Sequence, residues 1–171
     1  MWCWAASGQM VMDYLGHSPS QCLQANNLFD RKDCPCTQCP PPVKSRSQPV
    51  KSNPPPCVQG GWPELERYGF NFKNRCNASL SWDELREQIS SERYCKKTPV
   101  LFSWRYRGGG GHMMVAIGYK TIDGKNYVEI LDPLVPCTGN STFIPYDVYA
   151  NGPDRRHRHW HDYYDITYTR E

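Results

Sequence analysis

The sequence changes character near Lys97, from helix-like to strand-like patterns, and this change constrains the fold more than any other feature. Before it, apolar residues recur at helical spacing; after it, short runs rich in β-branched and aromatic residues follow one another. Helices followed by strands indicate an α+β fold in which a helical lobe packs on an antiparallel sheet lobe with a cleft between them. With 171 residues and 39% hydrophobic content, we expect a single domain over residues 1–171.

Helix signals occupy the first half of the chain. The first helix is predicted over residues 4–15, with Gly16 as its C-terminal stop and Cys3 at its N-terminus. A second is predicted to start at Ser18-Pro19, since serine caps helices and proline fits a first turn.

Two further helices and the strands complete the predicted elements. A short helix is predicted over residues 63–68 and ends at Gly69. Another is predicted to begin at Ser81, which forms a capping box with Glu84. Strands are predicted over residues 99–104, 113–119, 127–131 and 160–168.

A thiol, an imidazole and a carboxylate each lie at the end of a predicted helix or strand. Cys3 opens the first helix, His112 enters the second strand and Asp132 leaves the third. A helix N-terminus and a neighbouring imidazolium both stabilise a thiolate. His112 would transfer the proton, and Asp132 would orient its ring through the other nitrogen. Gly108–Gly111 would leave room for a substrate backbone just before the histidine.

The turn between the second and third strands decides whether His112 and Asp132 can meet. A two-residue turn of Asp123-Gly124 would place them on opposite faces of the sheet. A three-residue loop with Gly124 in the left-handed conformation would place them on one face. We predict the three-residue loop.

The cysteine count is odd. With Cys3 as the free nucleophile, eight of the nine cysteines remain, which is enough for four disulfides of undetermined pairing. The eight are Cys22, Cys34, Cys36, Cys39, Cys57, Cys76, Cys95 and Cys137. A zinc site at Cys34, Cys36, Cys39 and Cys57 is the alternative, but the Cys-x-Cys spacing is short for a zinc knuckle, so disulfides are favoured.

Residues 34–57 are rich in proline, lysine, serine and cysteine, and are predicted to form a loop tethered by cysteines at both ends. We hypothesise that this insertion shapes substrate access or binds a partner. A second basic segment, Arg155–His161, is interpreted as a solvated loop. The remaining histidines, which are His17, His157, His159 and His161, are interpreted as surface residues.

Charge and hydropathy exclude several classes of partner. The net charge is only +3, with basic residues scattered, so neither nucleic acid nor anionic lipid is expected as a partner. No apolar run approaches the roughly 18 residues of a membrane span, and no signal peptide precedes Trp2.

With these residues assembled, the sequence resembles the papain-like cysteine proteases, in particular the bacterial group related to the effector protease AvrRpt2. The resemblance rests on three motifs in order and extends over nearly the whole chain. They are Trp2-Cys3-Trp4-Ala5-Ala6, the strand from Gly111-His112 to Gly118-Tyr119, and Ile130-Leu131-Asp132-Pro133.

The resemblance implies a papain-like fold and peptide hydrolysis through a thioester on Cys3, with no cofactor and no metal. It also implies a protein or peptide substrate, an inhibitor or immunity protein as a further partner, and a secreted or translocated bacterial effector or toxin. Papain-like enzymes usually carry a glutamine before the nucleophile, which completes the oxyanion hole with the backbone N–H of Cys3. Only Met1 and Trp2 precede Cys3, so either the start is trimmed or the activity of this chain is impaired.

Two other classes of function remain open besides a protease. The same Cys-His-Asp chemistry serves deamidases and transglutaminases, which act on a glutamine side chain. A disulfide-stapled binding module with a silent thiol is the third class, and it predicts no dependence on His112.

Overall fold

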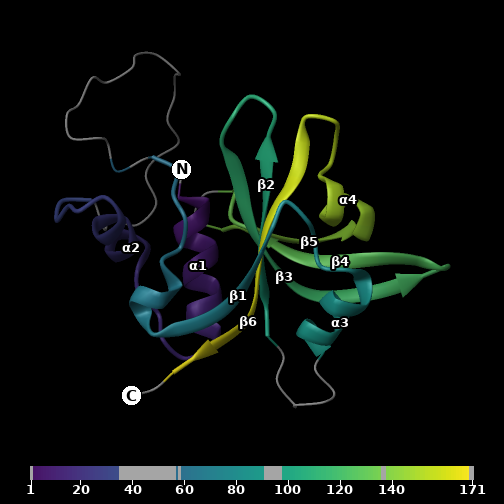
Figure 1. Ribbon diagram of the computed structural model, residues 1–171, viewed down its shortest axis with the longest axis horizontal. Helices are drawn as coiled ribbons and strands as arrows, with labels where there is room; N and C mark the ends of the chain where they lie inside the picture. The colour runs from purple at the N-terminus through teal and green to yellow at the C-terminus, as the bar shows by residue number, and fades with distance from the viewer. Residues whose placement is uncertain (1, 35–56, 58, 91–97, 136–137, 170–171) are drawn as a thin grey trace.

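Six antiparallel strands form one sheet with helices on both of its faces (Figure 1). The computed structural model describes residues 2–34, 57, 59–90, 98–135 and 138–169. The helices are α1 (Cys3–Tyr14), α2 (Gln21–Leu28), the 3-10 turn η1 (Leu65–Tyr68), α3 (Trp82–Ser90) and α4 (Tyr146–Asn151). The strands are β1 (Phe70–Cys76), β2 (Val100–Tyr106), β3 (Gly111–Ile122), β4 (Lys125–Asp132), β5 (Asn140–Pro145) and β6 (His157–Tyr168). Their order across the sheet is β1-β6-β2-β3-β4-β5, and the α+β class is therefore confirmed.

Each face of the sheet carries its own hydrophobic core. Alternation along β2 sends Leu101 into a cluster with Trp4 and Val11 of α1, and Phe102 into a cluster with Leu85 of α3 and Tyr149 of α4. All six side chains are almost completely buried. Burial of each stabilises the fold by about 1.5–3 kcal/mol before entropy is counted. Among the described residues, no helix is long and apolar enough to cross a membrane.

The helix starts follow local capping, with one correction. Ser81 and Glu84 form the predicted capping box, because Glu84 N–H donates to Ser81 Oγ at 3.3 Å and Ser81 N–H donates to Glu84 Oε2 at 2.7 Å. The prediction of Ser18 as the cap of α2 is wrong. Ser20 caps that helix and accepts from Leu23 N–H at 3.2 Å, so the helix begins at Gln21, beyond Pro19.

Three elements were not predicted: β1, β5 and α4. β1 is an edge strand with a mostly exposed, polar sequence, so its alternation is weak. β5 lies at the other edge and is likewise exposed. α4 has only six residues, too few for a helical period to show. The interpretation of Arg155–His161 as a loop is also wrong from His157 onward, because β6 begins there.

The predicted three-residue turn of the β3–β4 hairpin is wrong, but His112 and Asp132 still lie on the same face of the sheet. Ile122 pairs with Lys125, so the connection is the two-residue Asp123-Gly124 turn, with positive φ at both residues. A β-bulge at Ile117, between Ala116 and Gly118, then shifts the register by one residue. This shift returns His112 and Asp132 to the same face of the sheet, as the three-residue loop would have done.

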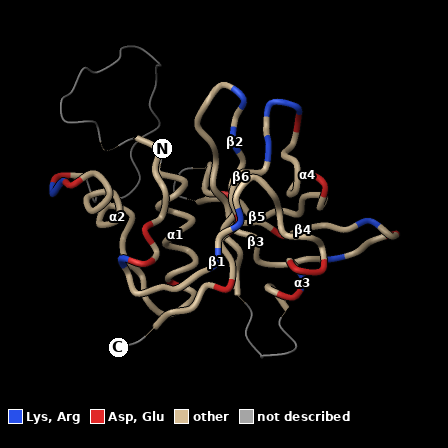
Figure 2. The backbone as a smooth tube through the Cα atoms, viewed as in Figure 1, with Lys and Arg blue, Asp and Glu red and all other residues tan. Residues whose placement is uncertain are grey.

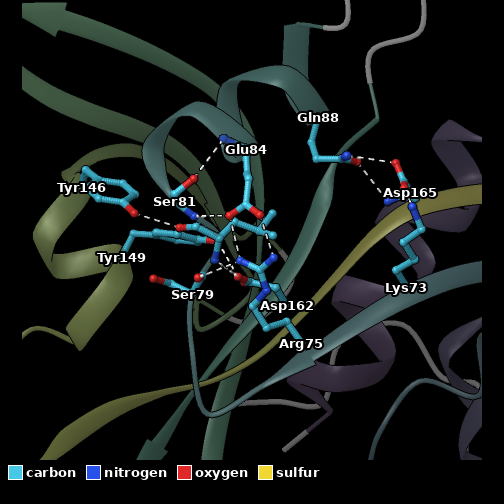
Figure 3. Close-up of polar contacts among 11 residues, drawn as sticks. Lys73, Arg75, Ser79, Ser81, Glu84, Gln88, Tyr146, Tyr149, Asp162 and Asp165 are labelled. Carbon is cyan, nitrogen blue, oxygen red and sulfur yellow. Dashed lines mark hydrogen bonds and ion pairs between the residues drawn. The ribbon is translucent and has the colours of Figure 1, made fainter.

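A buried polar network fixes α4 and the start of α3 to β6 (Figure 3). The fully buried Asp162 carboxylate accepts from Leu80 N–H at 2.6 Å and from Tyr149 O–H at 2.8 Å. His159 Nε2 lies 2.9 Å from its other oxygen, and His159 Nδ1 lies 2.9 Å from the Tyr149 carbonyl. His159 is only 7% exposed, so its interpretation as a surface residue is wrong.

Replacing Asp162 by alanine should destabilise the fold strongly, because it leaves two or three buried donors without an acceptor. Each such donor costs about 1–3 kcal/mol, so a loss of at least about 2 kcal/mol is expected in urea denaturation. Asp83→Ala is the matched control, since the Asp83 side chain is exposed in its ion pair with Arg86 and its loss should cost no more than about 1 kcal/mol. Equal losses for the two variants would contradict the network.

Candidate active site

Cys3 lies at the first residue of α1, where the helix meets the start of β3. Tyr106 N–H donates to Gly110 O at 3.0 Å, so alternation along the β2–β3 ladder turns the backbone groups of Met113 away from β2. β4 first pairs with β3 at Val115, which leaves these groups for the helix. The Met113 carbonyl accepts from buried Ser7 Oγ at 3.0 Å, and the Met113 N–H helps to lower the pKa of the Cys3 thiol.

His112 and Asp132 form the contact that the sequence predicted. His112 Nε2 lies 2.6 Å from Asp132 Oδ1, and the same oxygen accepts from Leu134 N–H at 2.8 Å. The imidazole is only 6% exposed. Its Nδ1 is buried and makes no hydrogen bond of ordinary geometry within the described residues. Because Nε2 contacts the carboxylate, Nδ1 is the ring nitrogen that is left to interact with the Cys3 thiol.

The electrostatics favour charge separation between the thiol and the imidazole. Burial acts to raise the pKa of the Cys3 thiol, but the hydrogen bond to His112, the Met113 N–H, the His112 charge and the Trp4 N–H together lower it. Burial acts to lower the pKa of His112, yet Asp132 and Cys3 raise it to about 9. Burial acts to raise the pKa of Asp132, and His112 with the Leu134 N–H lowers it. The site therefore favours a thiolate beside an imidazolium.

The glycines before His112 have two different roles. Gly108, Gly109 and Gly110 face open space, in agreement with the room predicted for a substrate. Gly111 is packed instead: a Cβ there would lie 2.5 Å from the Trp104 carbonyl and 3.0 Å from the Trp160 ring. Gly111 is thus required for close packing of β3 at its first residue.

The cysteines differ from the prediction of four disulfides. Cys34 and Cys57 form a disulfide with a Cα–Cα distance of 5.5 Å, and Cys22 is disulfide-bonded too. Cys3 and Cys76 are free, so the assignment of Cys76 to a disulfide is wrong. Cys76 ends the edge strand β1, where its sulfur is exposed and lies 3.2 Å from His161 Nδ1.

The predictions for Cys36, Cys39, Cys95, Cys137 and most of the 34–57 insertion lie outside the described residues. The Cys34–Cys57 bond uses two of the four thiols that the zinc alternative required. Across residues 2–34, 57, 59–90, 98–135 and 138–169, no group of three His, Cys, Asp or Glu side chains is placed to hold a metal ion.

Sequence reasoning missed the supports around Cys3. Ser7 lies one turn after Cys3 on the same face of α1, so helical periodicity carried a signal for it. Tyr106 ends β2 near the site, and burial first, then the charges of Cys3 and Asp132, raise the pKa of its hydroxyl. No local sequence signal marks Tyr106, because only the β2–β3 register brings it there.

A family model described as the Peptidase_C39 like family matches residues 1–151. Because the match covers most of the 171 residues, the chain belongs to this family. Membership supports a peptidase of the cysteine type, which acts on protein or peptide substrates. No curated protein and no solved structure matches the chain.

The lowered pKa of Cys3 predicts rapid alkylation under mildly acidic conditions. At about pH 6, where an ordinary thiol of pKa about 8.5 is protonated, iodoacetamide should modify Cys3 in the non-reduced protein. His112→Ala should slow this reaction at least about tenfold. The hydrogen bond and charge of His112 lower the pKa of the Cys3 thiol, and without them burial would raise it. Peptide mapping by mass spectrometry gives the site and the rate.

Cys76 is the internal control, as the other free thiol among the described residues. Its modification should not respond to the His112 substitution. A Cys3 rate unchanged in His112→Ala would show that the thiol and imidazole do not interact.

Proposed function

We propose that the protein hydrolyses peptide bonds by nucleophilic catalysis, with Cys3 as nucleophile, His112 as acid and base, and Asp132 as the orienting carboxylate. The observation that carries the proposal is the position of His112: its Nε2 lies 2.6 Å from Asp132 Oδ1, and it is close enough to Cys3 for each group to shift the pKa of the other. Membership of a peptidase family supports the reaction class.

The reaction would proceed in two halves. The Cys3 thiolate attacks the carbonyl carbon of the scissile bond, and the imidazolium of His112 donates its proton to the departing amine. This leaves a thioester between Cys3 and the N-terminal part of the substrate. Water then attacks the thioester while His112 accepts its proton, which releases the carboxylate product and restores the thiol. Asp132 keeps the ring oriented and stabilises its charged form throughout.

The backbone N–H of Cys3 would stabilise the oxyanion. As a first-turn donor of α1 it has no partner within the helix and adds to the positive end of the helix dipole. Gln24 does not replace the glutamine that papain-like enzymes carry, because its buried amide donates to the carbonyls of Ala5 and Pro19.

The remaining features of the proposal rest on resemblance. We infer a papain-like arrangement in one domain, with the site in a cleft between a helical and a sheet lobe, and kinship with the AvrRpt2-like effector proteases. A secreted or translocated effector or toxin is consistent with the Cys34–Cys57 disulfide, since such bonds persist in oxidising surroundings. An inhibitor or immunity protein would be a natural further partner.

A peptide library made from a digested proteome tests the reaction itself. The wild-type protein should generate new N-termini, detected by N-terminal labelling and mass spectrometry, and Cys3→Ala should generate none. Asp132→Ala should lower kcat/KM on the order of 10²-fold, because the unsupported imidazole loses its orientation and charge.

Three outcomes are informative. A gain of about one dalton at glutamine without cleavage would identify a deamidase, and glutamine crosslinks would identify a transglutaminase. No turnover of any kind with an alkylatable Cys3 would favour a binding module and overturn the proposal.

The pKa directions predict a bell-shaped dependence of kcat/KM on pH. Activity should fall below the lowered pKa of Cys3, where the thiol is protonated, and again above about pH 9, where His112 loses its proton. The basic limb should move to lower pH in Asp132→Asn, because Asp132 is the main group that raises the pKa of His112. A basic limb that stays near pH 9 in this variant would contradict the assignment.

A further inference from the structure

A cluster of arginines lies at one end of the sheet, where the β2–β3 and α4–β6 connections stand side by side (Figure 2). The two connections are held together by Arg107 N–H, which donates to the Arg156 carbonyl at 2.7 Å. A hollow at this place is bounded by the β1–α3 connection and the end of α4. Five arginines line it: Arg105, Arg107, Arg155, Arg156 and Arg158. We call these five residues the arginine cluster.

Two members of the cluster face each other across the sheet. Arg105 of β2 pairs directly with Arg158 of β6 in the antiparallel register, so both side chains leave the same face. Like charges in directly opposite positions repel and destabilise a sheet. A fold that retains such a pair, with both residues exposed, leaves two guanidinium groups ready for an external anion.

The protein itself neutralises little of this charge. In the described part of the chain, Arg105, Arg107, Arg155 and Arg158 form no ion pair with a carboxylate. Asp154 is the one acidic residue that lines the hollow, and it already contacts Arg156 at 3.2 Å and His157 at 2.6 Å. Arg105 is held in place by its contact with the Trp160 ring, 6.0 Å from the ring centroid.

The cluster adjoins the candidate active site through the strand register. Arg105 pairs with Gly111 of β3, the residue directly before His112, and Trp160 packs over that glycine. Tyr106 lines the same hollow and lies within electrostatic reach of Cys3 and Asp132. A polypeptide that reaches Cys3 past this end of the sheet would therefore pass the arginines.

We propose that the arginine cluster is a specificity site that binds carboxylate side chains of the substrate, so that the enzyme selects peptides with an acidic segment next to the scissile bond. This inference rests on the proposed peptidase function and names its substrate class. Guanidinium groups bind carboxylates through paired, charge-assisted hydrogen bonds, and the walls of the hollow bring several of them to one place. The cluster is suited to a peptide because it flanks the site where a scissile bond would lie.

The test uses the cleavage sites found in the proteome-derived peptide library. Acidic residues should be enriched on one side of the cut. For one cleaved peptide, replacing its glutamates by glutamine should lower kcat/KM about tenfold or more, as expected for loss of charged hydrogen bonds. The double variant Arg105→Gln/Arg158→Gln should lose this discrimination, so that its kcat/KM values for the glutamate and glutamine peptides become equal. Its Tm should be unchanged or higher, because the cross-strand repulsion is gone.

Lys120→Gln/Lys125→Gln is the control for net charge, since it changes the charge by the same amount and these lysines lie on the β3–β4 hairpin away from the cluster. This control should keep the preference for the glutamate peptide. Cleavage with no acidic preference, or a preference that survives the double arginine variant, would overturn the specificity site and leave the peptidase intact.

If no peptide is cleaved, the proposed peptidase function is overturned. A peptide-binding measurement then still tests whether the arginine cluster binds carboxylates. The Cys3→Ala protein should bind fluorescent hexaglutamate more tightly than hexaglutamine in an anisotropy titration, and Arg105→Gln/Arg158→Gln should abolish the difference. Equal binding of both peptides would count against the site. Tighter binding of a short single-stranded DNA than of hexaglutamate, lost in the same variant, would reassign the cluster to nucleic acid and reject the acidic-peptide site.

Discussion

The backbone of Met113 is the point at which the helical and sheet parts of the candidate site join. Its carbonyl accepts from Ser7 of α1 and its N–H lowers the pKa of the Cys3 thiol, so the two peptide groups that flank Met113 connect β3 both to the helix and to the thiol that the helix carries. The neighbouring residue in sequence is His112. The helix that carries Cys3 and the imidazole are thus both attached at adjacent residues of β3.

The carboxylate side of the site depends on a different device. The Asp-Gly turn alone would have sent Asp132 to the wrong face, and the extra residue Ile117 reverses that outcome within the same hairpin. The turn gives the strands their tight connection, and the bulge adjusts which side chains meet at the far end. On the other face of the sheet, the buried network around Asp162 also joins helices to a strand, because it holds α4 and the start of α3 against β6.

Much of this could be predicted from sequence, since the three site residues stand at ends of elements with strong local signals. Cys3 precedes an amphipathic helix, and His112 and Asp132 flank apolar strands, so residue type and position were both informative. The capping box at Ser81 was equally local. The bulge at Ile117 could not be predicted, because it is decided by packing between strands. The free state of Cys76 and the burial of His159 depend on long-range register, and the polar edge strands β1 and β5 carry little periodicity.

Trp2, the residue before Cys3, makes a hydrogen bond that links α1 to a disulfide. Trp2 donates a hydrogen bond from its indole Nε1 to the carbonyl of Cys57, and Cys57 is bonded to Cys34, which packs in the core beside α1. The start of α1 is therefore linked to a disulfide, a bond that persists under oxidising conditions. Thiol reductants would break this link, so the redox state of the compartment also affects how firmly the start of α1, and with it Cys3, is held.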